Sequence, residues 1–211
     1  MTVAVVPVTP DRWADLAAFF GPNGAYSNCW CAWFRVRAKD FDAGPGNHRV
    51  LRRLTCEGAV PGLLAYDSTE PADSHLVEGN RRNSLADSVH DPPQVVGWVS
   101  VAPREQFERI IRSRVIGPAD PDEKDIWSLV CFWIPARNRG RGLGTVLLDA
   151  AVDHARANGA AAVEAYPVET LGERRPSADL FTGTVDMFRK AGFTITPHPT
   201  SGRPIARRRL P

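Results

Sequence analysis

Three glycines and two arginines stand within seven consecutive residues, NRGRGLG, at positions 138–144. Glycine has no Cβ, so several backbone amides can converge on one bound group, and arginine adds a guanidinium that pairs well with phosphate. The stretch follows an apolar run and precedes a helical pattern, so the first amides of that helix lack partners within it. We therefore expect these residues to form a loop that binds a phosphate or a pyrophosphate.

Two common phosphate-binding loops fit this stretch poorly. A Walker loop requires a lysine after its last glycine, and the stretch contains none. A dinucleotide-binding G-x-G-x-x-G fingerprint, counted from Gly140, needs a third glycine where Thr145 stands. Glu164, about 20 residues further on, could accept a ribose hydroxyl, but too few residues follow it for the second half of a doubly wound domain. A nucleotide-dependent oxidoreductase is therefore kept only as an alternative.

Regular elements are predicted on both sides of the loop. Residues 126–134 form a nearly continuous apolar run, which is typical of a strand buried on both faces. This order of elements predicts an α/β fold, with a mixed central β-sheet flanked by helices and at least one parallel pair. Downstream of the loop we expect a helix from Leu143 to Asn158-Gly159, a strand at 161–168, a helix from Gly183-Thr184 to Gly192 and a strand at 193–197.

The first half of the chain predicts further elements of the same sheet. Residues 67–94 are rich in Asp, Ser, Asn, Glu and Pro and show no apolar period, so we expect a flexible surface loop there. The strands on either side of it look like partners, which favours one domain over residues 1–211. Strands are expected at 3–8, 61–66 and 95–102, and helices from Thr9-Pro10 to Phe20, at 48–58 and at 104–112.

Composition argues against several classes of protein. A formal net charge of +2 gives no support for nucleic-acid binding, and the cluster Arg207–Arg209 is interpreted as a solvated strand end. No stretch reaches the ~18 apolar residues of a membrane span, and the N-terminus shows no signal-peptide pattern. Four cysteines are too few for a disulfide-rich scaffold. We therefore expect a cytoplasmic protein that contacts neither nucleic acid nor membrane.

A second cluster of chemically active residues lies in the stretch YSNCWCAWFR. Cys29 and Cys31, together with Cys56 and His48, include the residue types that bind zinc. Their C-x-C spacing differs from the usual C-x₂₋₄-C, and no second close pair follows, so no metal site is predicted. Cys131, in the buried strand, is interpreted as a small apolar filler.

Arg139-x-x-Gly142-x-Gly144 resembles the R/Q-x-x-G-x-G/A signature of the GNAT superfamily of acyl-coenzyme A-dependent N-acetyltransferases. The buried strand before it, Leu147-Leu148 after it and the later MFRKAGF resemble the same family over about residues 126–195. The resemblance extends loosely to the N-terminal elements and does not cover the polar insert. It implies the GNAT-like acyl-CoA N-acyltransferase fold, acetyl-CoA as co-substrate without a metal, and direct attack by a primary amine on the acetyl group.

The resemblance also implies which residues hold acetyl-CoA. The pyrophosphate would bind the amides of Arg139, Gly140, Arg141, Gly142, Leu143, Gly144 and Thr145. The strand before the loop would offer backbone groups to the pantetheine arm through Cys131, Phe132, Trp133 and Ile134.

The sequence departs from the family pattern at the catalytic groups. Phe188 stands where the closing helix often carries a tyrosine that protonates the leaving thiolate, and Trp127 or Ser128 stands where some members carry a glutamate. We therefore expect substitutes on the strand at 161–168, where Tyr166 and Glu164 share one face. Tyr166 is a candidate acid and Glu164 a candidate base. The alternative is that Glu164 pairs with a cation and Tyr166 is an aromatic residue at the rim.

The acceptor is left open by the sequence as a small-molecule amine or an amine of a peptide or protein, and a homodimer is left open too. Trp30, Trp33 and Phe34 are expected to pack beside the acceptor cleft. The missing tyrosine keeps a non-catalytic acyl-CoA-binding or regulatory module as a further alternative.

Overall fold

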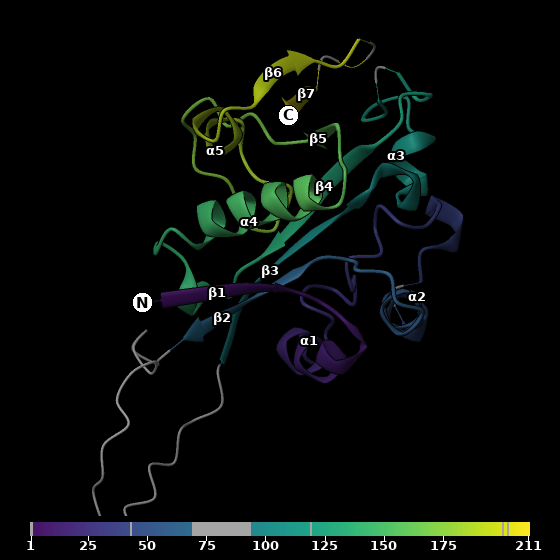
Figure 1. Cartoon of the computed structure of the whole chain (residues 1–211), viewed down its shortest axis with the longest axis vertical. Coiled ribbons are helices and arrows are strands. Elements are labelled where there is room, and N and C mark those ends of the chain that lie inside the picture. Colours follow the sequence, from purple (N-terminus) through teal and green to yellow (C-terminus); the bar gives the residue numbers. More distant parts are fainter. Residues whose placement is uncertain (1, 43, 69–93, 119, 200, 202) are drawn as a thin grey trace, which may run out of the picture.

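Among the residues that the structure describes, seven strands form one mixed β-sheet in the order β1-β2-β3-β4-β5-β7-β6 (Figure 1). This computed structural model describes residues 2–42, 44–68, 94–118, 120–199, 201 and 203–211. Strands β1 to β4 are antiparallel neighbours, β4 and β5 are parallel, and β7 runs antiparallel to both β5 and β6. The strands are β1 Thr2–Pro7, β2 Leu63–Ser68, β3 Gln94–Pro103, β4 Ile126–Trp133, β5 Ala162–Ala165, β6 Thr194–Pro197 and β7 Pro204–Arg209.

Helices cover both faces of this sheet. In Figure 1, α4 lies on one side of the sheet and α1 and α2 lie on the other. The α-helices are α1 Trp13–Phe20, α2 Pro45–Cys56, α3 Glu108–Ile111, α4 Leu143–Ala157 and α5 Val185–Lys190. Four short 3-10 turns join them, η1 Pro10–Arg12, η2 Ala38–Asp40, η3 Arg104–Gln106 and η4 Ala136–Asn138. The predicted mixed α/β sheet flanked by helices is confirmed.

The core is divided by the sheet. One cluster joins α4 and α5 to the inner face of the central strands, and Leu147, Leu148 and Phe188 are buried in it. On the opposite face, α1, α2 and the aromatic residues after α1 pack against β2 and β3 around Trp98. A third cluster lies at α3, where Phe107 packs beside Val130 and Tyr166. Apolar burial of this kind contributes about 25 cal/mol per Å².

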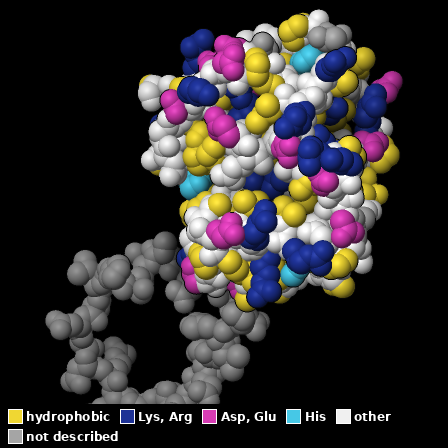
Figure 2. All heavy atoms as spheres, turned by 90° about the vertical axis from the view of Figure 1, so that its right-hand side faces the viewer, with side chains coloured by type: hydrophobic (Ala, Val, Ile, Leu, Met, Phe, Trp, Pro, Cys, Tyr) yellow, Lys and Arg dark blue, Asp and Glu magenta, His cyan; other side chains and the backbone are white. Residues whose placement is uncertain are grey.

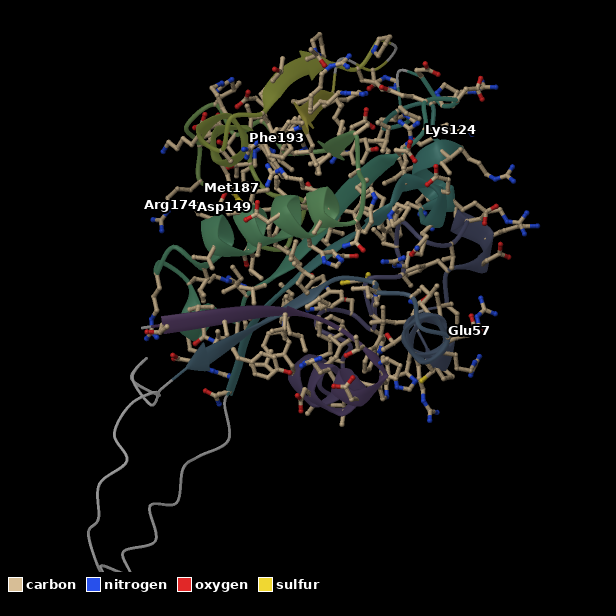
Figure 3. All side chains as sticks on the ribbon, in the orientation of Figure 1. Glu57, Lys124, Asp149, Arg174, Met187 and Phe193 are labelled. Atoms are coloured by element: carbon tan, nitrogen blue, oxygen red, sulfur yellow. The ribbon has the colours of Figure 1, made fainter. Side chains whose placement is uncertain are left out.

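The two helices on the α4 side begin and end where their terminal residues allow. Gly142, with φ of 77°, precedes α4, and Gly159, with φ of 79°, follows its last turn. Before α5, the side chain of Thr184 accepts a hydrogen bond from the amide of Met187 at 3.3 Å, as a capping threonine does. Figure 3 shows Met187 beside α4, so α5 packs against the helix that follows the glycine loop.

The structure differs from the sequence-based elements at several places, and the strand predicted at 61–66 runs from Leu63 to Ser68. The strand predicted at 161–168 stops at Ala165, two residues before Pro167, which has no amide hydrogen to donate to a ladder. The helix predicted at 104–112 is divided into η3 and α3. Thr9 does not cap η1, because its hydroxyl accepts a hydrogen bond from Arg12. The helix predicted at 48–58 starts earlier, at Pro45.

Two further predictions concern the surface. The interpretation of Arg207 as solvated is wrong, because its guanidinium donates to Glu123 and Glu164. The flexible loop predicted at 67–94 falls mostly on residues 69–93, which lie outside the described residues. No helix in the described part of the chain is long and apolar enough to cross a membrane. On the face shown in Figure 2, Lys and Arg side chains are interspersed with Asp and Glu.

Candidate active site

The glycine loop connects β4 to α4 and is held from both sides. The amide nitrogen of the buried Asn138 side chain donates to the carbonyl of Val96 at 3.3 Å, which anchors the loop to β3. The Nε of Arg139 donates to the carbonyl of Ile134 at 2.7 Å, which folds the loop back over the end of β4. Gly140 and Gly142 both have positive φ, near 75° and 77°, a conformation that favours glycine.

Five consecutive amides of this loop are left without protein partners. No described residue accepts a hydrogen bond from the amides of residues 140–144. A Cβ added at Gly140 or Gly142 would meet nothing within 4 Å, so the loop is open at both of these positions. The first turn of α4 contains no acidic residue that would compete for its positive end. The arrangement fits an anion such as the pyrophosphate of coenzyme A.

The two ends of the predicted amide set differ from its centre. The amide of Arg139 donates to the carbonyl of Ala136 at 3.2 Å, and that of Thr145 donates to the carbonyl of Gly142 at 3.0 Å. Both donors are therefore already used within the protein. The free set is Gly140, Arg141, Gly142, Leu143 and Gly144.

Strands β4 and β5 separate where the pantetheine arm was predicted. Their parallel pairing ends at Leu129 opposite Ala165. Beyond that point the amide of Phe132 donates to the carbonyl of Phe181 at 2.7 Å. The segment between β5 and α5 therefore lies beside β4 at this point. The Phe132 amide already has a protein partner, and the pantetheine contacts through residues 131–134 stay a prediction.

A cavity of about 570 Å³ lies at this opening. Its lining includes Cys131–Trp133 at the end of β4 and Ile134 just after it, together with Arg139 and Trp33, so the structure brings these predicted site residues together. Its lining combines the loop after α1, the end of β4 and the segment before α5, and no described lining residue carries a carboxylate. The other lining residues are Gly24, Ala25, Tyr26, Ser27, Cys29, Cys31, Phe41, Ser177, Ala178, Leu180 and Phe181.

Two other predicted wall residues lie elsewhere. Trp30 and Phe34 are buried in separate core clusters and do not line the cavity. A second hollow, of about 770 Å³, lies beside α2, between Asp40, Asp42 and the arginines of that helix. It contains none of the predicted site residues. The functional site is therefore assigned to the cavity at the end of β4.

Glu164 is enclosed by cations. It is 2% exposed, and its carboxylate receives hydrogen bonds from Arg104 at 3.3 Å and Arg207 at 2.8 Å. Arg207 also pairs with Glu123, and this interaction lowers the pKa of the Glu123 carboxyl. Glu164 does not line the cavity, so its surroundings match the alternative of a structural ion pair. Its role as a base stays a prediction that the geometry does not favour.

Tyr166 lies next to Glu164 and not at the cavity. Its side chain is fully buried, and its hydroxyl lies 3.4 Å from Oγ of Ser128 and 3.5 Å from Oε2 of Glu164. Burial, followed by the charge of Glu164, raises the pKa of this phenol. The alternative of an aromatic residue at the rim is wrong, because Tyr166 belongs to the core. Its role as an acid stays a prediction, with no described contact to the cavity.

Phe188 stands at the position that often carries a tyrosine in the family, and its phenyl ring has no hydroxyl. Phe188 is fully buried, and its ring centre lies 5.1 Å from that of Phe193 and 6.4 Å from that of Phe132. The hydroxyl of Ser128 forms a hydrogen bond with the hydroxyl of Tyr166, and Trp127 packs edge-on against His154. None of these positions offers the described cavity a proton donor.

Sequence reasoning missed part of the cavity. Tyr26, Leu180 and Phe181 reach it from segments without helical or strand periodicity. A signal for the first of these segments exists, because GPNG at 21–24 marks a turn. The candidate zinc residues Cys56 and His48 lie apart, Cys56 in the hollow beside α2 and His48 against Trp30. In the described part of the chain no three metal-binding side chains gather.

Comparisons with known proteins identify the family. The sequence profile described as "Acetyltransferase (GNAT) family" matches residues 60–193, which is more than half of the chain. The fold is similar to that of a GCN5-related N-acetyltransferase from Kribbella flavida, with 18% identity, a TM-score of 0.51 and coverage of 99% of this chain and 98% of that one. The chain belongs to the GNAT acetyltransferase family. It is therefore classed as an acyltransferase.

More distant solved structures were also found. NAA60 from Arabidopsis thaliana in complex with acetyl-CoA is 10% identical, with a TM-score of 0.48 and coverage of 99% and 100% of the two chains. PaiA N-acetyltransferase from Thermoplasma acidophilum in complex with coenzyme A is 13% identical, with a TM-score of 0.48 and full coverage of both chains. No curated protein matches the chain in sequence.

Proposed function

We propose that the protein transfers an acetyl group from acetyl-CoA to the primary amine of an apolar small molecule by direct attack. The observation that carries this proposal is the run of five free amides at residues 140–144, which opens beside the cavity at the end of β4. Acetyl-CoA supplies, when bound, an acetyl thioester that is already activated toward amines. The protein then needs to hold and orient the two reactants rather than activate them with a metal.

The loop provides the binding energy for the co-substrate. The amides of residues 140–144 and the positive end of the 15-residue helix α4 are suited to a pyrophosphate, and Arg141 adds an exposed cation. Residues 131–134, at the end of β4 and just after it, line the cavity together with Arg139 of the loop. The cavity wall would therefore position the acetyl group, while the loop holds the distant end of the molecule.

The lining of the cavity supports an apolar acceptor. Trp33, Phe41, Trp133 and Phe181 supply aromatic surface, and no described lining residue supplies a carboxylate for an ammonium group. A protonated amine would lose its water there without gaining a carboxylate partner, which is costly. The acceptor would therefore enter as the neutral amine, which is also the nucleophilic form.

The test is release of coenzyme A across a panel of amines. We expect turnover with aromatic and other apolar amines, and lower kcat/KM with polyamines and with peptides that carry charged residues near the amine. Coenzyme A should be measured by chromatography, because the four free cysteines of the protein also react with thiol reagents. Preferred turnover of a polycationic amine would contradict the assignment of an apolar acceptor.

A non-catalytic acyl-CoA-binding module is the second candidate. The observation that favours it is that the buried Phe188, which has no hydroxyl, stands at the position where related enzymes often carry a tyrosine. Saturable binding of acetyl-CoA without turnover of any amine in the panel would support this candidate. Displacement of acetyl-CoA by NADPH would instead support the nucleotide-dependent oxidoreductase.

A further inference from the structure

Arg35 is a buried cation that has only neutral partners among the described residues. It is 6% exposed, and its guanidinium donates to the carbonyl of Pro61 at 2.8 Å, to Oε1 of Gln106 at 3.1 Å and to Oγ of Ser100 at 3.4 Å. Its Nε has no hydrogen-bond partner. Burial lowers the pKa of Arg35 to about 10, and the neighbouring thiols act in the opposite direction. A buried charge of this kind calls for a nearby negative charge.

The titratable groups whose charge acts on Arg35 are two thiols in the cavity wall, Cys31 and Cys131. The Sγ of Cys31 accepts a hydrogen bond from the indole Nε1 of Trp98 at 3.1 Å, and it lies 3.4 Å from the Sγ of Cys131, with which it shares a thiol hydrogen bond. An indole N–H can only donate, so it favours a sulfur that accepts. The pKa of Cys31 is lowered, chiefly by the Cys131 thiol and further by Trp98 and Arg35, against the effect of burial. The same contact raises the pKa of Cys131.

The backbone holds Cys31 in this place at a cost. Trp30 and Cys31 have φ of 47° and 51°, in the left-handed region that residues with a side chain seldom adopt. Such strain persists only where surrounding contacts over-determine it. Here the ring of Trp30 packs between Phe20 and His48, with ring centres 5.6 and 4.5 Å away. Packing of the neighbouring tryptophan therefore holds the strained backbone segment that carries Cys31.

We infer that Cys31 and Cys131 form an oxidant-sensitive dithiol in the wall of the cavity, with Cys31 as the sulfur that reacts first and a hydroperoxide as the oxidant. The thiolate of Cys31 attacks the peroxide, its sulfur gains one oxygen as sulfenic acid, and the O–O bond breaks to release hydroxide or an alkoxide. The thiol of Cys131 then displaces the sulfenic oxygen as water, and the S–S bond forms. Two thiols are oxidised and one peroxide is reduced, so no further reactant is needed.

The geometry suits this pair better than the other two cysteines. The sulfurs of Cys31 and Cys131 are 3.4 Å apart, and a disulfide needs about 2.05 Å, so a small movement suffices. Both residues line the cavity, through which a small peroxide can reach them. Burial, followed by the charge of Cys31, raises the pKa of Cys29 to about 11. Cys56 is exposed on α2, and no described group donates a hydrogen bond to its sulfur.

The first experiment follows the products of hydrogen peroxide treatment by mass spectrometry. The reduced full-length protein is treated with limiting hydrogen peroxide, quenched in acid, alkylated and digested. We expect a disulfide-linked pair of peptides that contain Cys31 and Cys131, before oxidation of Cys29 or Cys56. Earlier oxidation of either of those two residues would overturn the inference.

Single variants separate the roles of the two sulfurs. In Cys131→Ser, we expect Cys31 to stop at the sulfenic acid, which a dimedone probe captures. In Cys31→Ser, we expect Cys131 to resist peroxide. Reaction of Cys131 at the parent rate would show that Cys31 is not the reactive thiolate. Both changes are isosteric, so we expect both variants to fold, and thermal unfolding checks this. Neither readout requires acetyltransferase activity. The failure of this inference is therefore distinguishable from failure of the proposed function.

A further variant tests why Cys31 reacts first. Trp98→Phe removes the indole donor and keeps an aromatic ring in the core. We expect its rate of sulfenic acid formation to fall on the order of tenfold, as expected for loss of one hydrogen bond to a charged group. Cys29→Ser in the same assay is the matched control and should keep the parent rate. An unchanged rate in folded Trp98→Phe would show that the thiolate does not depend on this contact and would overturn the assignment.

Discussion

At the scale of single residues, Gly142 offers the most direct test of the proposed pyrophosphate loop. Its φ is 77°, and the space around its Cβ position is open. Gly142→Val would place a branched side chain where the pyrophosphate approaches. We expect the rise in Tm that acetyl-CoA causes in the parent protein to be absent in this variant, because a ligand that no longer binds gives no stabilisation. Thermal unfolding over a series of acetyl-CoA concentrations measures it.

Gly58 offers a matched control for this change. It follows α2, has φ of 84° and also has open space at its Cβ position. Gly58→Val should therefore carry a similar backbone cost, while the shift caused by acetyl-CoA stays at the parent value. A full shift in Gly142→Val would contradict the assignment of the loop.

Tyr166 allows a structural role to be separated from a catalytic one. Its hydroxyl contacts Ser128 and Glu164 inside the core and does not line the cavity. We expect Tyr166→Phe to lower the free energy of unfolding by about 1 kcal/mol, the usual loss for one buried hydrogen bond, and to leave kcat unchanged. Denaturant unfolding and steady-state kinetics measure the two effects. A fall in kcat at constant KM would instead establish an interaction made in the transition state.

At the scale of elements, β2 and β3 are neighbouring strands, and the polar insert joins them in the sequence. Their register continues to Asp67 opposite Gln94, so the two strands end side by side. We expect replacement of residues 69–93 by an Asn-Gly turn to preserve the fold and acetyl-CoA binding, and to stabilise the protein by about 2 kcal/mol or less through shorter loop closure. Circular dichroism and the acetyl-CoA-dependent Tm shift test this. Loss of that shift in a folded variant would assign the insert a role in binding.

The ends of α4 and α5 are set by residues close to them in the sequence. The glycines that flank α4 and the threonine that caps α5 act within one or two turns of their own position. The segment between β5 and α5 has no such local pattern, and tertiary contacts, such as the hydrogen bond from the Phe132 amide to the Phe181 carbonyl, place it beside β4. Local chemistry therefore predicts helix ends, whereas the cavity wall depends on packing.

At the scale of the whole molecule, Glu164 joins parts of the chain that are far apart in sequence. It receives one hydrogen bond from Arg104, which follows β3, and another from Arg207 of β7. We expect Glu164→Gln to lower the free energy of unfolding by roughly 3 kcal/mol, the low end for breaking a buried pair, because Arg104 keeps three carbonyl acceptors. Chemical denaturation at neutral pH measures the change.

Glu123→Gln is the matched control for this network. Its side chain also pairs with Arg207 but is about a third exposed. Solvent screens such a pair, so we expect a loss of about 1 kcal/mol or less. An equal loss in the free energy of unfolding in the two variants would mean that burial does not determine how much each ion pair contributes.

The sequence alone determined the features that depend on neighbouring residues. The glycine loop, the helix after it and most strands were predicted because turn chemistry and apolar periodicity act over a few residues. The family resemblance at Arg139, Gly142 and Gly144 rests on the same local pattern. The candidate phosphate site could therefore be read before any fold was known.

Only the tertiary structure decided what the remaining side chains touch. Arg104 and Arg207 stand 60 and 43 residues from Glu164, and Cys31 stands 100 residues from Cys131. No periodicity relates residues at such separations, because their contacts arise when the sheet brings distant strands and loops together. For this reason the chain's sequence indicated two candidate catalytic groups on β5, while packing enclosed both of them in the core and placed a pair of thiols in the cavity wall.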